Sequence, residues 1–194
     1  MRKERKRCEY AIEEALKGKR VALICSGDPG VYALSGLVLE LLKNIKDGDK
    51  LDVTIISGVT SLTACAALLG APIGHDFAVI SLSDILTPWD IIEKRIDAAS
   101  MADFVIALYN PRSKRRVIQL ERAVSIIKRY RDDSTPVGIV KRAMRDGQKV
   151  VITNLKDLLK CEDIDMQTTV IVGNSSSYIW NNKIITPRGY NIEQ

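Results

Sequence analysis

The chain has 194 residues, which is enough for one large domain or two small ones. Hydrophobic residues make up 46% and charged residues 27%, ordinary values for a globular protein that argue against intrinsic disorder. The net charge of +5 favours an anionic partner such as nucleic acid, phosphate or a polycarboxylate, although the same charge also serves solubility alone.

The sequence contains no pattern typical of a membrane span, a signal peptide or a metal site. No apolar run approaches the ~20 residues of a membrane span, and no signal-peptide pattern follows the basic N-terminus. The widely spaced Cys8, Cys25, Cys65 and Cys161 contain no CxxC pair and predict reduced thiols in a cytoplasmic protein. The single histidine, His75, has no neighbouring ligand for a metal.

The first third of the chain alternates between helical and extended patterns. Apolar residues recur at helical spacing or form short continuous runs, and the latter are typical of strands buried on both faces. The predicted elements are a helix over Lys3–Lys17, a strand over Arg20–Cys25, a helix over Gly30–Leu42, a strand over Leu51–Ile56 and a helix over Thr60–Leu69. This order predicts a parallel sheet with right-handed crossovers.

The run Gly70–Gly74 interrupts this pattern and predicts a boundary between domains 1–74 and 75–194. The second domain is predicted to be α/β with a mixed sheet. Its strands are expected over Asp76–Leu82, Asp103–Tyr109, Pro136–Val140, Lys149–Thr153 and Thr168–Val172, its helices over Pro88–Ser100, Ser113–Tyr130 and Asn154–Lys160, and a terminal hairpin over Ile179–Ile185.

Two polar loops follow the two predicted strands of the first third. In the loop of residues 26–32 (SGDPGVY), Gly27 and Gly30 allow close approach of a ligand to the backbone. Asp28 is suited to accept hydrogen bonds from ligand hydroxyls, and it equally suits a plain helix N-cap. The loop of residues 57–61 (SGVTS) repeats the arrangement. Two such loops at neighbouring strand ends would form one crevice.

A third loop, Tyr109–Arg116, carries four cations within five residues. Arg112 suits bidentate recognition of a carboxylate or phosphate, and the alternative is a solvated basic face. Aromatic residues are only 5% of the chain, which weakens a nucleic-acid interpretation. No nucleophile with a histidine base can be assembled, so transfer between two bound partners fits better than covalent catalysis.

Seven segments together resemble the tetrapyrrole methylase family, in particular its ring-contracting branch. They are SGDPGVY, SGVTSLTACAALLGAPIGHDF, SLSDILTPW, LYNPRSKRR, PVGIVKRAMRDGQKV, TTVIVGNSS and TPRGY. The resemblance implies two α/β domains with S-adenosylmethionine in the cleft between them, and a homodimer. It also implies transfer of a methyl group to carbon 17 of an acidic, porphyrin-like substrate, with ring contraction, in corrin synthesis.

The same resemblance implies site residues. The cofactor contacts would be Gly27, Asp28, Val31, Thr60, Ser61, Tyr109, Asn110, Ala143 and Thr169. On electrostatic grounds alone, the cations expected to hold substrate carboxylates are Arg112, Lys114, Lys141 and Arg142. Ser81 and Asp84, at a strand end, are expected to assist proton movement during ring contraction.

Family members carry a strand and a Gly-Pro-rich turn ahead of the helix with which this chain begins. The N-terminal domain is therefore expected to lack its first strand, which would expose a sheet edge. This leaves open an inactive, truncated remnant, or a tetrapyrrole-binding module without methyl transfer. A basic RNA-binding protein is the third alternative, and it predicts binding that falls steeply with salt.

Overall fold

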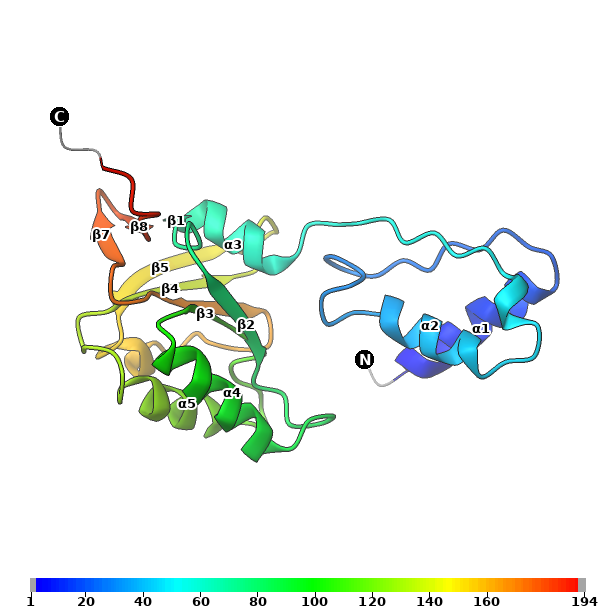
Figure 1. The fold of residues 1–194 in the computed structure, drawn as a ribbon, viewed down its shortest axis with the longest axis horizontal. Coiled ribbons are helices and arrows are strands. Elements are labelled where there is room, and N and C mark those ends of the chain that lie inside the picture. Colours follow the sequence, from blue (N-terminus) through cyan, green and yellow to red (C-terminus); the bar gives the residue numbers. More distant parts are fainter. Residues whose placement is uncertain (1–2, 192–194) are drawn as a thin grey trace. The chain divides into compact units, whose positions relative to one another are not determined.

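The computed structural model describes residues 3–191, and the chain divides into two compact units, Met1–Thr60 and Ser61–Gln194. The boundary follows Thr60, whereas the sequence places it at Gly70–Gly74. The helix that precedes the glycines packs with the second unit because its apolar face, including Leu62 and Leu69, is buried against that unit's sheet. Figure 1 shows the helices and strands of both units, coloured along the sequence.

The first unit is built on two helices. These are α1 (Glu4–Leu16) and α2 (Ser35–Lys43), followed by the short 3-10 helix η1 (Gly48–Lys50). Cys8 and Ile12 on α1, with Leu34 and Leu42 beside and on α2, form the small buried core of this unit. The helix predicted from Gly30 begins only at Ser35, because residues 30–34 form turns and bends after the Gly-Asp-Pro-Gly segment.

The two strand predictions in the first unit are wrong. Residues 20–25 and 51–56 run without helix or strand structure, and the described chain gives them no ladder hydrogen bond. Ile24 and Ile56 are 78% and 80% exposed, although the sequence predicts both to be buried. An apolar run of this kind becomes a buried strand only when neighbouring strands pair with its backbone and helices cover its faces.

A five-stranded mixed sheet forms the centre of the second unit, in the order β2-β3-β6-β4-β5. Its strands are β2 (Phe77–Ser81), β3 (Val105–Tyr109), β4 (Pro136–Lys141), β5 (Lys149–Asn154) and β6 (Thr168–Val172). Strands β2 and β3 are parallel, while β6 is antiparallel to both β3 and β4, and β5 is antiparallel to β4. The predicted mixed sheet and its five strands are confirmed, with ends shifted by one or two residues.

Alternate residues of these strands fill two cores, one on each face of the sheet. Ile106 and Leu108 of β3 pack toward α4 (Trp89–Met101) and α5 (Gln119–Ile127). Val105 and Ala107 pack on the other side with α3 (Ser61–Leu69). Figure 1 shows α4 and α5 on one side of the sheet and α3 on the other. The continuous apolar sequence of β3 follows from burial on both faces.

A small second sheet has the order β1-β8-β7 and contains the predicted terminal hairpin. Its strands are β1 (Gly70–Ala71), β7 (Tyr178–Trp180) and β8 (Lys183–Ile185). Asn181 and Asn182 both have positive φ, as a two-residue hairpin turn requires. The hairpin prediction is confirmed, and β8 also pairs in parallel with β1.

Two helices of the second unit are shorter than predicted. The helix expected over Ser113–Tyr130 is observed as α5 (Gln119–Ile127). Its predicted first turns form a loop in which the Ser113 hydroxyl accepts the N–H of Arg116, while Ser113 N–H donates to the Arg116 carbonyl. Serine competes in this way with helical hydrogen bonding. The helix expected over Asn154–Lys160 is only the 3-10 helix η2 (Leu158–Lys160).

Candidate active site

Asp28 joins the two polar loops of the first unit. Its Oδ1 accepts a hydrogen bond from the Gly30 N–H at 2.8 Å, and its Oδ2 accepts one from the Gly58 N–H at 2.9 Å. These backbone donors, Gly58 first, lower the pKa of the Asp28 carboxyl and keep it ionised. The predicted proximity of loops 26–32 and 57–61 is therefore confirmed. Asp28 is not the N-cap of α2, which begins seven residues later.

The loops meet so closely that glycine is required. A Cβ on Gly58 would lie 2.3 Å from the Gly27 carbonyl oxygen, and Gly27 itself has φ +79°. Val31 is half-buried, and its N–H donates to the Asp28 carbonyl at 3.3 Å. Thr60 is half-buried at the end of the second loop. Four of the predicted cofactor contacts, Gly27, Asp28, Val31 and Thr60, thus lie on the parts of these loops that belong to the first unit.

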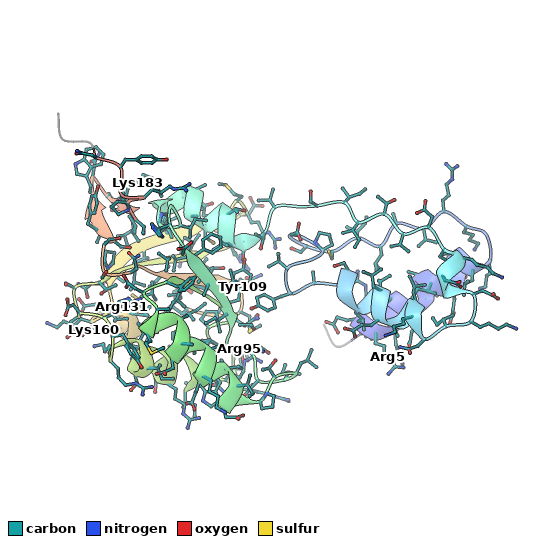
Figure 2. All side chains as sticks on the ribbon, viewed as in Figure 1. Arg5, Arg95, Tyr109, Arg131, Lys160 and Lys183 are labelled. Carbon is teal, nitrogen blue, oxygen red and sulfur yellow. The ribbon has the colours of Figure 1, made fainter. Side chains whose placement is uncertain are left out.

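In the second unit, hydroxyl groups gather where β3 ends and β6 begins. Tyr109, labelled in Figure 2, is the last residue of β3 and lies opposite Thr169 of β6 in the ladder. The Tyr109 hydroxyl accepts the N–H of Leu62 at 2.7 Å. Thr169 Oγ1 donates to Ser61 Oγ at 3.2 Å. Two residues of the sheet therefore fix the first turn of α3, and three predicted cofactor contacts lie together.

Asn110 and Ser81 extend this group of side chains. Asn110 has φ +54°, and its Nδ2 donates to Ser81 Oγ at 2.9 Å. Ser81 lies beside Tyr109 in the ladder of β2 and β3. Asp84 is exposed and accepts a hydrogen bond from Gln119 Nε2 of α5 at 3.0 Å. The two residues proposed for proton movement therefore have different partners.

Ala143 and Cys65 complete the surroundings with apolar contacts. Ala143 follows β4 and packs on the core that contains α3. Cys65 is buried in the same core, and burial raises the pKa of its thiol to about 11, against a smaller opposing effect of a hydrogen bond with Thr169. The thiol is thus neutral near neutral pH and is unsuited to act as a nucleophile.

Two of the four proposed substrate-binding cations have partners within the protein. Lys141 forms ion pairs with Asp163 and, at 2.9 Å, with Asp165. Lys149 also contacts Asp163, and the hydrogen bonds from Lys141 and Lys149 lower the pKa of the Asp163 carboxyl to about 2. Arg142 Nε donates to the Gln167 side chain at 2.7 Å.

The other two cations, Arg112 and Lys114, line a surface cavity of about 350 Å³. Its remaining lining residues are Ser113, Ile164, Asp165, Met166 and Gln167. The only acidic contact of Arg112 in residues 3–191 is a long one, 3.8 Å to Glu121. Both cations are thus available to an anion in the cavity.

Sequence reasoning missed the residues that hold these groups in place. They are Leu62, Gln119, Asp163, Asp165, Met166 and Gln167. The acidic run of residues 162–165 was a visible signal that nearby lysines would be paired. The Leu62 N–H and the Gln119 amide carry no such signal, because their roles depend on where α3 and α5 pack.

Comparisons with known proteins agree with these features. A "Cobalt-factor III methyltransferase" of Priestia megaterium is 52% identical over 98% of this chain, and the chain spans 35% of that protein's length. A "Probable cobalt-factor III C(17)-methyltransferase" of Salmonella typhimurium is 50% identical over 99% of this chain and 78% of its own. The crystal structure of the methyltransferase CobJ matches with a TM-score of 0.88 and 35% identity, over 95% of this chain and 77% of that one.

The sequence model of the family described as Tetrapyrrole (Corrin/Porphyrin) Methylases matches residues 1–159. Because this model covers most of the chain, and the Salmonella relative is 50% identical over 99% of it, the chain belongs to the tetrapyrrole methylase family.

Proposed function

We propose that this chain is an S-adenosylmethionine-dependent C-methyltransferase of cobalamin biosynthesis. Its substrate is cobalt-factor III, and the product is methylated at carbon 17 with contraction of the ring. The metal-free counterpart precorrin-3B is the alternative substrate. Cobalt, where present, belongs to the substrate. A cytoplasmic location and a homodimer are part of the same proposal.

The observation that carries the proposal is the 50% identity to the Salmonella relative across 99% of this chain. Identity of this extent covers every loop that the sequence singled out, including both glycine loops and the basic loop after β3. It favours a catalyst over the tetrapyrrole-binding module considered above, because that relative and the Priestia protein are both named methyltransferases.

The described residues fit S-adenosylmethionine, which members of this family use. Bound there, the cofactor would supply an electrophilic methyl group on its sulfonium sulfur. Ser61, Tyr109 and Thr169 are neutral hydroxyl groups held by hydrogen bonds, and they suit the cofactor's uncharged polar groups. Gly27 and Gly58 allow the two loops to pack closely against each other, which fixes the backbone that would contact the cofactor.

Catalysis then depends on positioning, since direct transfer to a carbon needs no nucleophile from the protein. Orientation of two bound reactants can lower a barrier by about 7–11 kcal/mol. Arg112 and Lys114 would hold substrate carboxylates, because they lack a close acidic partner in the described chain. Lys141 and Arg142 would contribute positive potential. Ser81 and Asp84 would carry protons during ring contraction.

Calorimetric titration with S-adenosylhomocysteine tests the cofactor site. We expect the wild type to bind and Thr169→Val to bind at least about tenfold more weakly, because the hydroxyl that orders Ser61 is lost. Thr54→Val, at an exposed position, is the matched control and should bind as the wild type. Equal affinities of all three proteins would contradict the cofactor assignment.

Methyl transfer is tested by incubating the protein with cobalt-factor III and S-adenosylmethionine carrying a deuterated methyl group. Mass spectrometry should show one labelled methyl group in the tetrapyrrole, and nuclear magnetic resonance should place it at carbon 17. Cofactor binding without any transfer, with both cobalt-factor III and precorrin-3B, would refute the proposed reaction and leave a binding module.

A further inference from the structure

Arg116 is a buried cation without a counter-charge. The residue is 9% exposed, and no carboxylate of the described chain lies within ion-pair distance of its guanidinium. Its Nη2 contacts the thioether sulfur of Met166 at 2.9 Å, and its Nε is buried without a hydrogen-bond partner. A thioether is a weak acceptor, so this contact offsets little of the cost of burying the charge.

Arg131, in the same unit, is a buried arginine whose charge is compensated within the protein. It is also 9% exposed, but its Nη2 lies 3.0 Å from an Asp103 carboxylate oxygen. Its Nη1 donates to the carbonyls of Ser100 and Tyr130. The Nε of Arg131, like that of Arg116, is buried without a hydrogen-bond partner. The two arginines therefore differ in the counter-charge and the backbone acceptors of their Nη atoms, which only Arg131 has among residues 3–191.

The surroundings of Arg116 supply the place for an external anion. Met166, which covers the guanidinium, also lines the cavity of about 350 Å³ with Arg112 and Lys114. Arg112 Nε is likewise buried and without a partner. The loop of residues 112–116 thus brings Arg112 and Lys114 to the cavity and Arg116 to the Met166 side chain that lines it. Their one acidic contact within ion-pair distance in residues 3–191 is the 3.8 Å approach of Glu121 to Arg112. Asp165 also lines the cavity, and its carboxylate pairs with Lys141 at 2.9 Å. With Asp165 compensated by Lys141, the cations of this loop leave an excess of positive charge beside the cavity.

We propose that this cavity is a carboxylate-binding subsite whose buried anchor is Arg116. A carboxylate side chain of the acidic tetrapyrrole enters beside Arg112 and Lys114. The unbranched Met166 side chain turns aside, and the guanidinium fork pairs with the carboxylate. The identity of the ligand as a tetrapyrrole carboxylate rests on the proposed function, whereas the anion chemistry follows from the unpaired arginines.

The test measures the affinity of the full chain for uroporphyrin III, an acidic tetrapyrrole. Binding is measured by the quenching of the fluorescence of uroporphyrin as the protein is added. Arg116→Met should bind at least about tenfold more weakly than the wild type, because a buried charge-assisted pair is lost. Arg116→Lys, which keeps the charge without the fork, should be intermediate. Arg95→Gln on α4 (Figure 2) removes one exposed charge elsewhere in the unit and should bind within about twofold of the wild type.

Melting temperatures separate this role from a structural one. Without ligand, Arg116→Met should melt at or above the wild-type temperature, because an uncompensated buried charge is removed. Uroporphyrin should raise the melting temperature of the wild type more than that of the variant. Wild-type affinity in Arg116→Met, or a lower melting temperature without ligand, would overturn the proposal.

Two further arms identify the anion and keep the two proposals apart. If inorganic phosphate competes with uroporphyrin at equal concentration, the subsite is a phosphate site and the carboxylate assignment is overturned. All Arg116 variants should bind S-adenosylhomocysteine as the wild type does. If the wild type does not bind S-adenosylhomocysteine, the proposed function is refuted but the subsite is not. If Arg116→Met binds uroporphyrin as tightly as the wild type does, the subsite is refuted but the proposed function is not.

Discussion

A methyl group added at Gly138 should displace the buried side chain of Leu69, the last residue of α3. Gly138 lies in β4 and pairs with Ile152 of β5 on one side and Ile171 of β6 on the other. A Cβ at this position would lie 2.3 Å from Leu69 Cδ1, about 1.1 Å closer than the 3.4 Å at which ordinary contacts begin. The strand cannot retreat, because both of its edges are hydrogen-bonded. The buried side chain of Leu69 must therefore move.

Overpacking of this kind costs about 1–3 kcal/mol, which is the loss of unfolding free energy we expect for Gly138→Ala. Leu69→Ala alone should cost about 2–5 kcal/mol through the cavity that it leaves. In the double variant the new methyl group occupies part of that cavity, so the combined loss should fall short of the sum by about 0.5–3 kcal/mol. Gly36→Ala in α2, with nothing within 4 Å of the added Cβ, is the control and should lose no stability.

Urea unfolding measures these values, with circular dichroism for the whole chain and tryptophan fluorescence for the second unit, which contains both Trp89 and Trp180. Gly138→Ala should also weaken binding of S-adenosylhomocysteine, because α3 carries Ser61 in its first turn. A loss below about 0.5 kcal/mol for Gly138→Ala, or additivity of the two substitutions within about 0.5 kcal/mol, would refute the reasoning.

Three further predictions concern hydrogen bonds and titrating groups. Tyr109→Phe removes the acceptor of the Leu62 N–H and should lower the free energy of unfolding by about 1–3 kcal/mol in urea titrations, and an unchanged value would show that water replaces the hydroxyl. The pKa of Asp163 is lowered from its ordinary 3.8 to about 2 in the folded state, so its stabilising effect is full above about pH 4 and is lost as the pH falls toward 2. Between about pH 4 and pH 2, the melting temperature of the wild type should fall more steeply than that of Asp163→Asn. An equal fall in melting temperature for the two proteins would contradict this prediction. Cys65, with a pKa of about 11, should react with N-ethylmaleimide at pH 8 on the order of 10²-fold more slowly than in the urea-unfolded chain, as followed by peptide mass mapping, and similar rates would show that the thiol is accessible.

Much of the second unit could be predicted from local sequence. The run TTVIV became β6 because five successive apolar or β-branched residues fit a strand with both faces covered. The pair Asn181-Asn182 marked the hairpin turn, because asparagine tolerates positive φ. The glycine loop around Asp28 was equally visible, since Gly27 and Gly30 flank an acceptor at a fixed spacing.

The same reasoning failed where a residue's state depends on a distant partner. RVALIC and LDVTII have the composition of buried strands, yet no strand is formed there in residues 3–191, because strand formation needs a hydrogen-bonded neighbour. Lys141 had the features of a free cation in its own loop. Asp163, 22 residues further along the chain, already pairs with it.

Composition, periodicity and turn residues therefore determined the class of each element and the loops in which polar chemistry would lie, because these depend on interactions a few residues apart. Tertiary structure alone decided which cations were left without a partner. Arg131 and Arg116 are equally buried, but of the two only Arg131 has a carboxylate within ion-pair distance in residues 3–191, that of Asp103, 28 positions earlier in the chain. Charge compensation depends on the distance between the cation and a carboxylate. For residues far apart in the sequence, that distance is fixed only when the sheet and its helices pack together.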